Sequence, residues 1–285
     1  MSPIHDQSYR RYQGDRRPVG HAWRVIAGDG IRQMLAKRVF LGLFIFAWIP
    51  FIVRAVQMYF ATSLGGSVPQ ASAFLSISPN TFRDFLDQQS VFVFFMTIYI
   101  GAGLIANDRR ANALQIYLSK PMLRMEYIGG KLLVLVSFLL SVTLVPALLL
   151  LVLQAAFAGN LTFLRANLFL IPAVVLSSFI IVTVASFTML ALSSLSKSSR
   201  FVAVMYTGAI FFTSALYGAL SLIFGSTRVA WVSIGANMEQ VIDVIFRKTP
   251  RYEVPTVICA MVLLALVVVS ISVLERRVRG VEVVS

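Results

Sequence analysis

The run from Leu132 to Phe157, LLVLVSFLLSVTLVPALLLLVLQAAF, decides the fold class of this chain. It holds no charged residue, and it is longer than the roughly 20 apolar residues with which an α-helix crosses a bilayer. Apolar and polar residues do not alternate along it, as they would in a strand of a membrane barrel. We therefore expect a spanning α-helix that tilts or continues into water.

Five further runs have the same character, and the composition agrees with them. The chain is 58% hydrophobic and 13% charged, with a mean hydropathy of +0.81, so it could not cover its apolar surface as a soluble globule. We predict an all-α integral membrane protein in which residues 39–285 form a single transmembrane domain. The predicted spans are residues 40–60, 85–105, 132–157, 168–195, 202–224 and 254–274.

Lysine and arginine gather on one side of these spans. With the N-terminus placed in the cytoplasm, 18 of the 25 basic residues are cytoplasmic and six lie on the other side, while Arg54 falls inside the first span. This bias follows the positive-inside rule, so we expect a multi-pass protein of the cytoplasmic membrane with both termini in the cytoplasm. We attribute the net charge of +13 to membrane lipids and exclude nucleic acid as a partner.

The segment before the first span is basic and partly amphipathic. We expect residues 1–20 to form a disordered basic arm and residues 21–38 to form an amphipathic helix at the membrane surface. An ordinary basic helix beside the membrane would show the same pattern. No cleavable signal peptide is visible, so the first span would direct insertion. The apolar face of the helix would consist of Trp23, Ile26, Ala27, Ile31, Met34 and Leu35.

Residues that carry enzymatic or ion-coupled chemistry are scarce. The two histidines, His5 and His21, precede the first span, and Cys259 has no partner cysteine, so we expect no catalytic residue and no metal site. The apolar cores of the predicted spans lack Asp, Glu, Lys and His, which argues against a proton carrier but leaves sodium coupling through carbonyl groups open. The fragment Gly129–Lys131 is followed by leucine, so no phosphate-binding loop is present. Any ATP and magnesium would bind to another chain.

A polar segment, Ala106–Lys131, separates the second and third spans and carries five basic residues. Leu114, Tyr117 and Leu118 recur at helical spacing and predict a short amphipathic helix. This helix ends before Pro121, which disfavours helical geometry in the residue that precedes it. A helix that merely lies on the lipid surface would show the same periodicity.

The order of residues in YLSKPMLRMEYIGGK, 117–131, resembles the segment after the second span in ABC-type export permeases of the type-two kind. Family members commonly carry Glu and Gly-Thr-Leu just before this segment, whereas this chain has Asp108, Arg109 and Arg110 there. We expect this departure to affect which ATPase is recognised, because rim charges tune partner choice. The matching positions are Leu118, Ser119, Lys120, Pro121, Arg124, Tyr127, Gly130 and Lys131.

The resemblance implies a non-catalytic permease subunit of an ATP-driven exporter. A coupling helix around Asp108–Leu118 would dock on a separate ABC ATPase subunit that binds ATP and magnesium, and residues 121–131 would act as a lever into the third span. A second copy of the chain, or a related permease, would complete the membrane part. The residues implied in ATPase coupling are Asp108, Arg109, Arg110, Leu114, Tyr117, Leu118, Pro121 and Arg124.

Residues 225–253 are long for a simple turn between the fifth and sixth spans. Asn237, with Gln240 three residues on, predicts the cap of a short helix with an apolar stripe. The resemblance implies that this segment is the family's outer hairpin, which dips into the membrane and gates the exit. A helix on the membrane surface is the alternative.

A substrate pathway would use the few polar and aromatic side chains of the spans. Arg54 would either extend to the lipid headgroups or contact a substrate or lipid. Aromatic residues of the second and fifth spans would either line a lateral pathway or simply pack in lipid. The candidates for pathway or lipid contact are Arg54, Phe95, Tyr99, Tyr206 and Phe212.

Two other functions remain compatible with the sequence. A non-conducting subunit that relays ATPase movements to an external partner would show the same ATPase interface without substrate flux. An ATP-independent carrier would transport without any ATPase. Nothing in the spans identifies a substrate.

Overall fold

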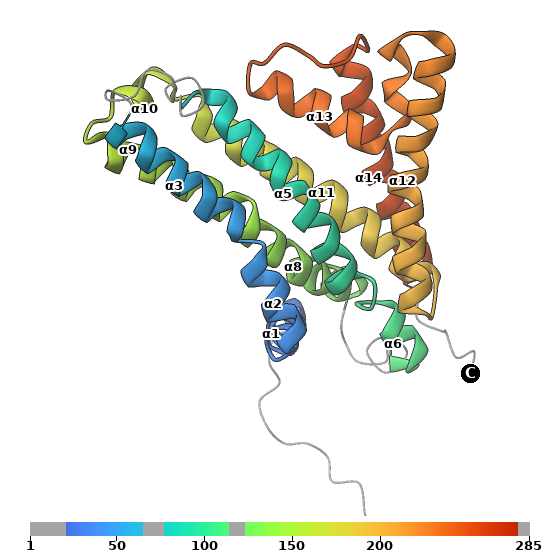
Figure 1. Ribbon diagram of the computed structural model, residues 1–285. Helices are drawn as coiled ribbons and strands as arrows, with labels where there is room; N and C mark the ends of the chain where they lie inside the picture. Colours follow the sequence, from blue (N-terminus) through green and yellow to red (C-terminus); the bar gives the residue numbers. More distant parts are fainter. Residues whose placement is uncertain (1–20, 65–76, 114–122, 279–285) are drawn as a thin grey trace, which may run out of the picture.

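The structure, a computed structural model, describes residues 21–64, 77–113 and 123–278. These residues form helices and connecting turns (Figure 1). The fold class expected from the sequence, all-α with six membrane spans, is confirmed. Within the described residues, the six helical segments long and apolar enough to cross a membrane are Arg38–Ser63, Pro79–Arg110, Arg124–Ala158, Leu170–Leu195, Ser199–Phe224 and Thr256–Arg277.

The first and third spans are each divided into two helices. The first consists of α2 (Arg38–Phe46) and α3 (Ile49–Leu64), and it is preceded by α1 (Ala22–Leu35). The third consists of α8 (Arg124–Val142) and α9 (Leu144–Ala158). Each division lies well inside the apolar run.

The second span begins earlier than the sequence indicates. α5 (Pro79–Gly101) starts before residue 85, the expected start. Proline suits the first helical turn, where its missing N–H needs no partner. The backbone N–H of Ser78 donates to Thr81 Oγ1 at 3.2 Å and helps to fix this start. The helix therefore includes Arg83, which lies outside the predicted span, as well as Asp87 near the start of that span.

The remaining helices complete the assembly. α1 and the short α6 lie at one end of it, and α10 and α13 lie at the other (Figure 1). We call these the α6 end and the α13 end. The other elements are α6 (Ala106–Arg110), α10 (Thr162–Ala166), α11 (Leu170–Leu195), α12 (Ser199–Phe224), η1 (Thr227–Val232), α13 (Ile234–Ile245) and α14 (Thr256–Arg277).

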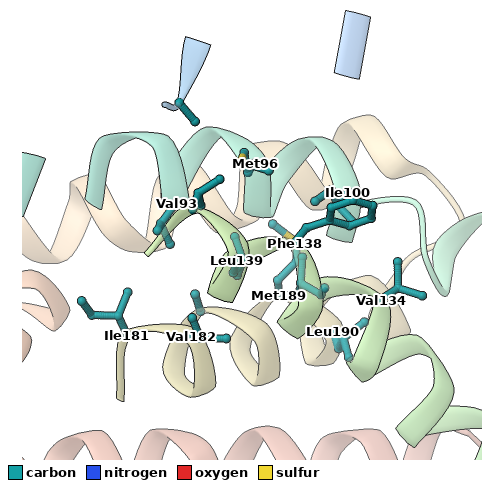
Figure 2. Packing of buried hydrophobic residues seen from close by; sticks show 14 of the residues in the cluster. Val93, Met96, Ile100, Val134, Phe138, Leu139, Ile181, Val182, Met189 and Leu190 are labelled. Atoms are coloured by element: carbon teal, nitrogen blue, oxygen red, sulfur yellow. The ribbon is translucent and has the colours of Figure 1, made fainter. Parts of the chain in front are cut away.

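Three helices, α5, α8 and α11, form the core. Their apolar side chains interlock where the helices pass one another, as Figure 2 shows for Met96 of α5, Leu139 of α8 and Met189 of α11. All three of these side chains are fully buried. Gly101 permits the close approach of α5 to α11, because a Cβ atom there would collide with Met189. Small residues serve this purpose in membrane proteins, where close packing drives helix association.

One side chain of the core joins the two divided spans. Gln89 of α5 is fully buried. Its Nε2 donates to the carbonyl of Ala47 at 3.1 Å, between α2 and α3, and to the carbonyl of Val142 at 2.6 Å, the last residue of α8. Main-chain groups at helix interruptions need partners where water is excluded. Gln89 therefore ties both interruptions to α5.

The helix expected in residues 225–253 is present, but its cap is not Asn237. α13 begins at Ile234, and Ser233 Oγ accepts a hydrogen bond from the backbone N–H of Ala236 at 3.3 Å. Asn237 is buried instead and donates to the carbonyls of Trp231 and Ser233, both at 2.8 Å. Ser233 is the N-cap because its φ and ψ are extended, as an N-cap requires, whereas Asn237 already lies within the helix.

Candidate functional site

The short helix α6 is joined to the core through one serine of α11. Ser193 Oγ accepts hydrogen bonds from the backbone N–H groups of Ile105 at 3.2 Å and Ala106 at 3.1 Å. It donates to the carbonyl of Ala102 at 3.0 Å. These groups lie in the turn between α5 and α6, where the helical hydrogen-bond ladder is interrupted. Because Ser193 is fully buried, the joint is shielded from competing water.

Two further bonds attach α6 to α8. Asp108 Oδ2 accepts a hydrogen bond from the Tyr127 hydroxyl at 2.7 Å and forms an ion pair with Lys131 Nζ at 2.7 Å. The side chains of Asp108 and Lys131 are only 19% and 15% exposed. Such partial burial strengthens an ion pair relative to one on an open surface. Asp108 therefore acts as an anchor within the chain.

The two arginines of α6 differ. Arg109 Nη1 donates to the carbonyl of Ser194 at the C-terminal end of α11, so it belongs to the joint. Arg110 is exposed to solvent. The resemblance implies that both arginines are charges at the rim of an ATPase interface. Of the two, only Arg110 has a side chain exposed for such a contact.

The helix expected over Asp108–Leu118 is not continuous. α6 ends at Arg110, and Asn112 adopts a left-handed conformation with φ of 52°. Asparagine tolerates this conformation better than most residues, and one such residue ends a helix. The expected contact residues Leu114, Tyr117, Leu118 and Pro121 lie outside the described residues, as does the basic arm of residues 1–20.

Beyond this gap, Arg124 is exposed at the first turn of α8. The same helix packs closely against α1. A Cβ atom on Gly130 would lie 2.8 Å from Ile26 Cβ and 3.1 Å from the carbonyl oxygen of Trp23. On α1 itself, Ala27 and Met34 of the expected apolar face are buried, whereas Leu35 is exposed. The start of the third span is therefore coupled by packing to both α1 and α6.

An apolar cavity of about 410 Å³ lies between α5, α11, α12 and the start of α13. Phe95 and Tyr206, two of the predicted pathway residues, line it together. Phe94 stacks on Tyr206 with ring centroids 5.9 Å apart. Phe95 is 53% exposed whereas Tyr206 is 4% exposed, so the cavity runs from the outer surface of the spans into the protein. Its size is that of a small-ligand site.

The other predicted pathway residues lie elsewhere. Tyr99 stacks on Phe40 with ring centroids 6.0 Å apart, near the α6 end. Phe212 is 68% exposed on α12. Arg54 Nη1 donates to Gln57 Oε1 at 2.9 Å, and its Nε donates to Gln88 Oε1 at 3.3 Å. The Arg54 charge is thus solvated in part by two amides of the protein.

A group of charged residues at the α13 end was not predicted from the sequence. Arg83 Nε lies 2.7 Å from Asp243 Oδ1, and Arg83 Nη1 lies 2.6 Å from Asp87 Oδ1. Arg251 Nε lies 2.8 Å from Asp243 Oδ2 and its Nη2 lies 2.7 Å from Asp87 Oδ2. We call these residues, with Glu239, the α13 charge network. It ties α5 to α13 and to the loop before α14.

Arg251 and Tyr252, in the loop before α14, contact the acidic residues of this network. Burial alone would lower the pKa of Arg251, but its hydrogen bond to Asp87 and the carboxylates of Asp243 and Glu239 raise it above the ordinary value. Burial and a 2.6 Å hydrogen bond from its hydroxyl to Glu239 raise the pKa of Tyr252. Both groups therefore keep their protons at neutral pH.

The described residues offer no site for a metal ion. In residues 21–64, 77–113 and 123–278, no group of three or more His, Cys, Asp or Glu side chains is arranged to hold one. The acidic residues of the α13 charge network are paired with arginine instead.

The described residues contain six apolar helical spans, so the chain is a multi-pass α-helical membrane protein. A family model described as ABC-2 family transporter protein matches residues 24–277, and the chain belongs to this family. The resemblance to type-two permeases is thereby confirmed, and the chain is the transmembrane component of an ABC transporter. Such permeases are generally non-catalytic and work with an ATPase partner. A search of curated proteins found no match.

Proposed function

We propose that this chain is the permease subunit of an ATP-driven exporter in the cytoplasmic membrane. The α6 end faces the cytoplasm, where a separate ABC ATPase binds ATP and magnesium. The observation that carries this proposal is the bonding of α6 to two spans at once, through Ser193 of α11 and through Tyr127 and Lys131 of α8. A force applied next to α6 would therefore reach the core directly.

In this mechanism the ATPase binds residues 108–118, and α6 transmits the movement of the ATPase to the spans. α5, α8 and α11 pack on one another, and a packed core passes strain on because it resists deformation. Gln89 joins the interruptions of the first and third spans, so these spans move with α5. The chain's own residues bind, position and transmit, and they perform no chemical step.

The apolar cavity supports export of an amphipathic or apolar substrate. Its walls are almost wholly apolar. Phe95 and Phe211 line its open side, on the outer surface of the spans, where their side chains are 53% and 63% exposed. A substrate already dissolved in the bilayer could enter sideways between α5 and α12. We propose this cavity as the pathway, with the buried Tyr206 in its wall.

A second permease copy, or a related permease, would cover α12. Only Val202 and Tyr206 of this helix are buried, and Phe212 is among its exposed aromatic residues. Because Cys259 is the chain's single cysteine, a Cys259→Ala, Phe212→Cys variant tests this contact. We expect disulfide cross-linking between two copies in membranes, and its absence would favour a heterodimer or another interface.

The decisive test is reconstitution with the co-purified ATPase in liposomes. We expect Leu118→Asp to abolish permease-stimulated ATP hydrolysis without affecting membrane insertion. Leu161→Asp is the matched control, because Leu161 is 49% exposed and directly precedes α10, which lies at the opposite end (Figure 1). Unchanged hydrolysis in Leu118→Asp would overturn the docking proposal. Coupled hydrolysis without flux of any apolar probe would favour a mechanical subunit over an exporter.

A further inference from the structure

A second cavity, of about 420 Å³, lies at the α6 end between α1, α5, α6, α8 and α12. It differs from the apolar cavity in the charges on its wall. Three cationic side chains, Lys37, Lys131 and Arg200, line it together with one carboxylate, Asp108. The amide of Asn107 also lines it and adds a neutral hydrogen-bond donor. The chemistry of this wall favours an anion.

The single carboxylate does not neutralise the cavity. Asp108 is already bound to Lys131 Nζ and to the Tyr127 hydroxyl, each at 2.7 Å. In the part of the chain that the structure describes, no carboxylate lies within ion-pair distance of Lys37 or Arg200. Among the described residues, Lys37 Nζ lies 6.0 Å from the centroid of the Tyr99 ring and 3.7 Å from Met34 Sδ. Two positive charges therefore remain available.

The position of these two cations indicates where the anion comes from. Lys37 directly precedes the first span, which starts at Arg38, and Arg200 is the second residue of the fifth span, which starts at Ser199. Both side chains therefore lie at the depth of the lipid headgroups. Ile98 and Ala203 give the same cavity an apolar wall, against which the glycerol and upper acyl carbons of a lipid would pack. A free phosphate ion would leave this wall uncovered.

We propose that this cavity binds the phosphate group of an anionic phospholipid from the leaflet at the α6 end. Lys37, just before α2, and Arg200, in the first turn of α12, both contact the phosphate. Lys131 stays paired with Asp108 and contributes positive potential. The site depends on neither the ATPase nor the transported substrate, so it can be tested on the isolated chain.

The test is native mass spectrometry of the delipidated chain titrated with phosphatidylglycerol. We expect one tightly held lipid per chain, and phosphatidylcholine, which has no net charge, should not replace it. The variant Lys37→Gln, Arg200→Gln should weaken this binding about 30-fold, since each basic residue near an anionic lipid contributes about 1 kcal/mol. The exchange Lys37→Arg, Arg200→Lys keeps both charges and should retain binding, which shows that loss in the first variant is not misfolding.

A matched control removes two charges outside the cavity. Arg32 on α1 and Arg276 at the end of α14 are also exposed, and Arg32→Gln, Arg276→Gln should leave the tightly held lipid in place. Equal losses in both neutralised pairs would overturn the proposal in favour of general surface attraction. Glycerol 3-phosphate separates the two sources of phosphate. If it displaced the lipid at equal concentration, the cavity would be a site for soluble phosphate and the lipid proposal would be wrong.

Discussion

Arg83 and Asp243 lie 160 residues apart in the chain, yet Arg83 Nε donates to Asp243 Oδ1 at 2.7 Å with both side chains almost completely buried. The pair connects the first turns of α5 to α13. A buried charge without its partner is very unfavourable, because it has lost its hydration. The attachment of α13 to α5 therefore depends on both residues together.

We expect Asp243→Ala to lower the free energy of unfolding by up to about 3 to 5 kcal/mol, because the buried Arg83 loses one of its two carboxylate partners and keeps only the more exposed Asp87. The double variant Arg83→Met, Asp243→Leu should recover much of this loss. Thermal unfolding in detergent measures both. The control is Lys248→Gln, because Lys248 lies 3.8 Å from Asp84 in a more exposed pair and should contribute at most about 1 kcal/mol. A small effect of Asp243→Ala would show that the network does not hold α13.

Gln89 and its neighbour Gln88 provide a second comparison. Gln89→Leu removes the donor to Ala47 and Val142 and should destabilise the protein by about 1 to 3 kcal/mol, as loss of a buried hydrogen-bond partner does. Gln88→Leu loses only an exposed acceptor for Arg54 and should have little effect. Equal melting temperatures for the two variants would contradict the role of Gln89 at the helix interruptions.

Adjacent glycines test the packing of α1 on α8. A Cβ atom on Gly130 would lie 2.8 Å from Ile26 Cβ, whereas one on Gly129 would meet nothing within 4 Å. We expect Gly130→Ala to cost about 1 to 3 kcal/mol through overpacking. Gly129→Ala should be neutral or stabilising by up to about 1 kcal/mol, because alanine favours the helix. Unfolding curves of the two variants decide the matter, and a stable Gly130→Ala protein would mean that α1 is loosely held.

These comparisons show what the sequence can and cannot reveal. Long apolar runs such as Leu132–Phe157 predict spans correctly, because hydrophobicity along one helix is a local property. The partners of Arg83 and Gln89 depend on which helices meet, and nothing near either residue distinguishes Gln89 from Gln88. The end of α6 was missed for a similar reason, because the left-handed backbone of Asn112 is one of several conformations that asparagine allows. Long-range pairing, rather than periodicity, decides the details of the site.

Ser193 and Ser194 are adjacent, fully buried and different in function. Ser193→Ala removes the acceptor for the N–H groups of Ile105 and Ala106, whereas the Ser194 hydroxyl only donates to Ala191 within its own helix, at 2.6 Å. We expect hydrogen exchange of the Ile105 and Ala106 amides to speed up roughly tenfold or more in Ser193→Ala, because losing about 1.4 kcal/mol or more of local stability has that effect. Ser194→Ala should leave the exchange of these amides unchanged.

In liposomes with the ATPase, Ser193→Ala should also lower flux per ATP hydrolysed, because a loosened α6 would move without displacing the core. Faster exchange with full coupling would show that the joint is structural only, and unchanged exchange would show that Ser193 does not hold α6.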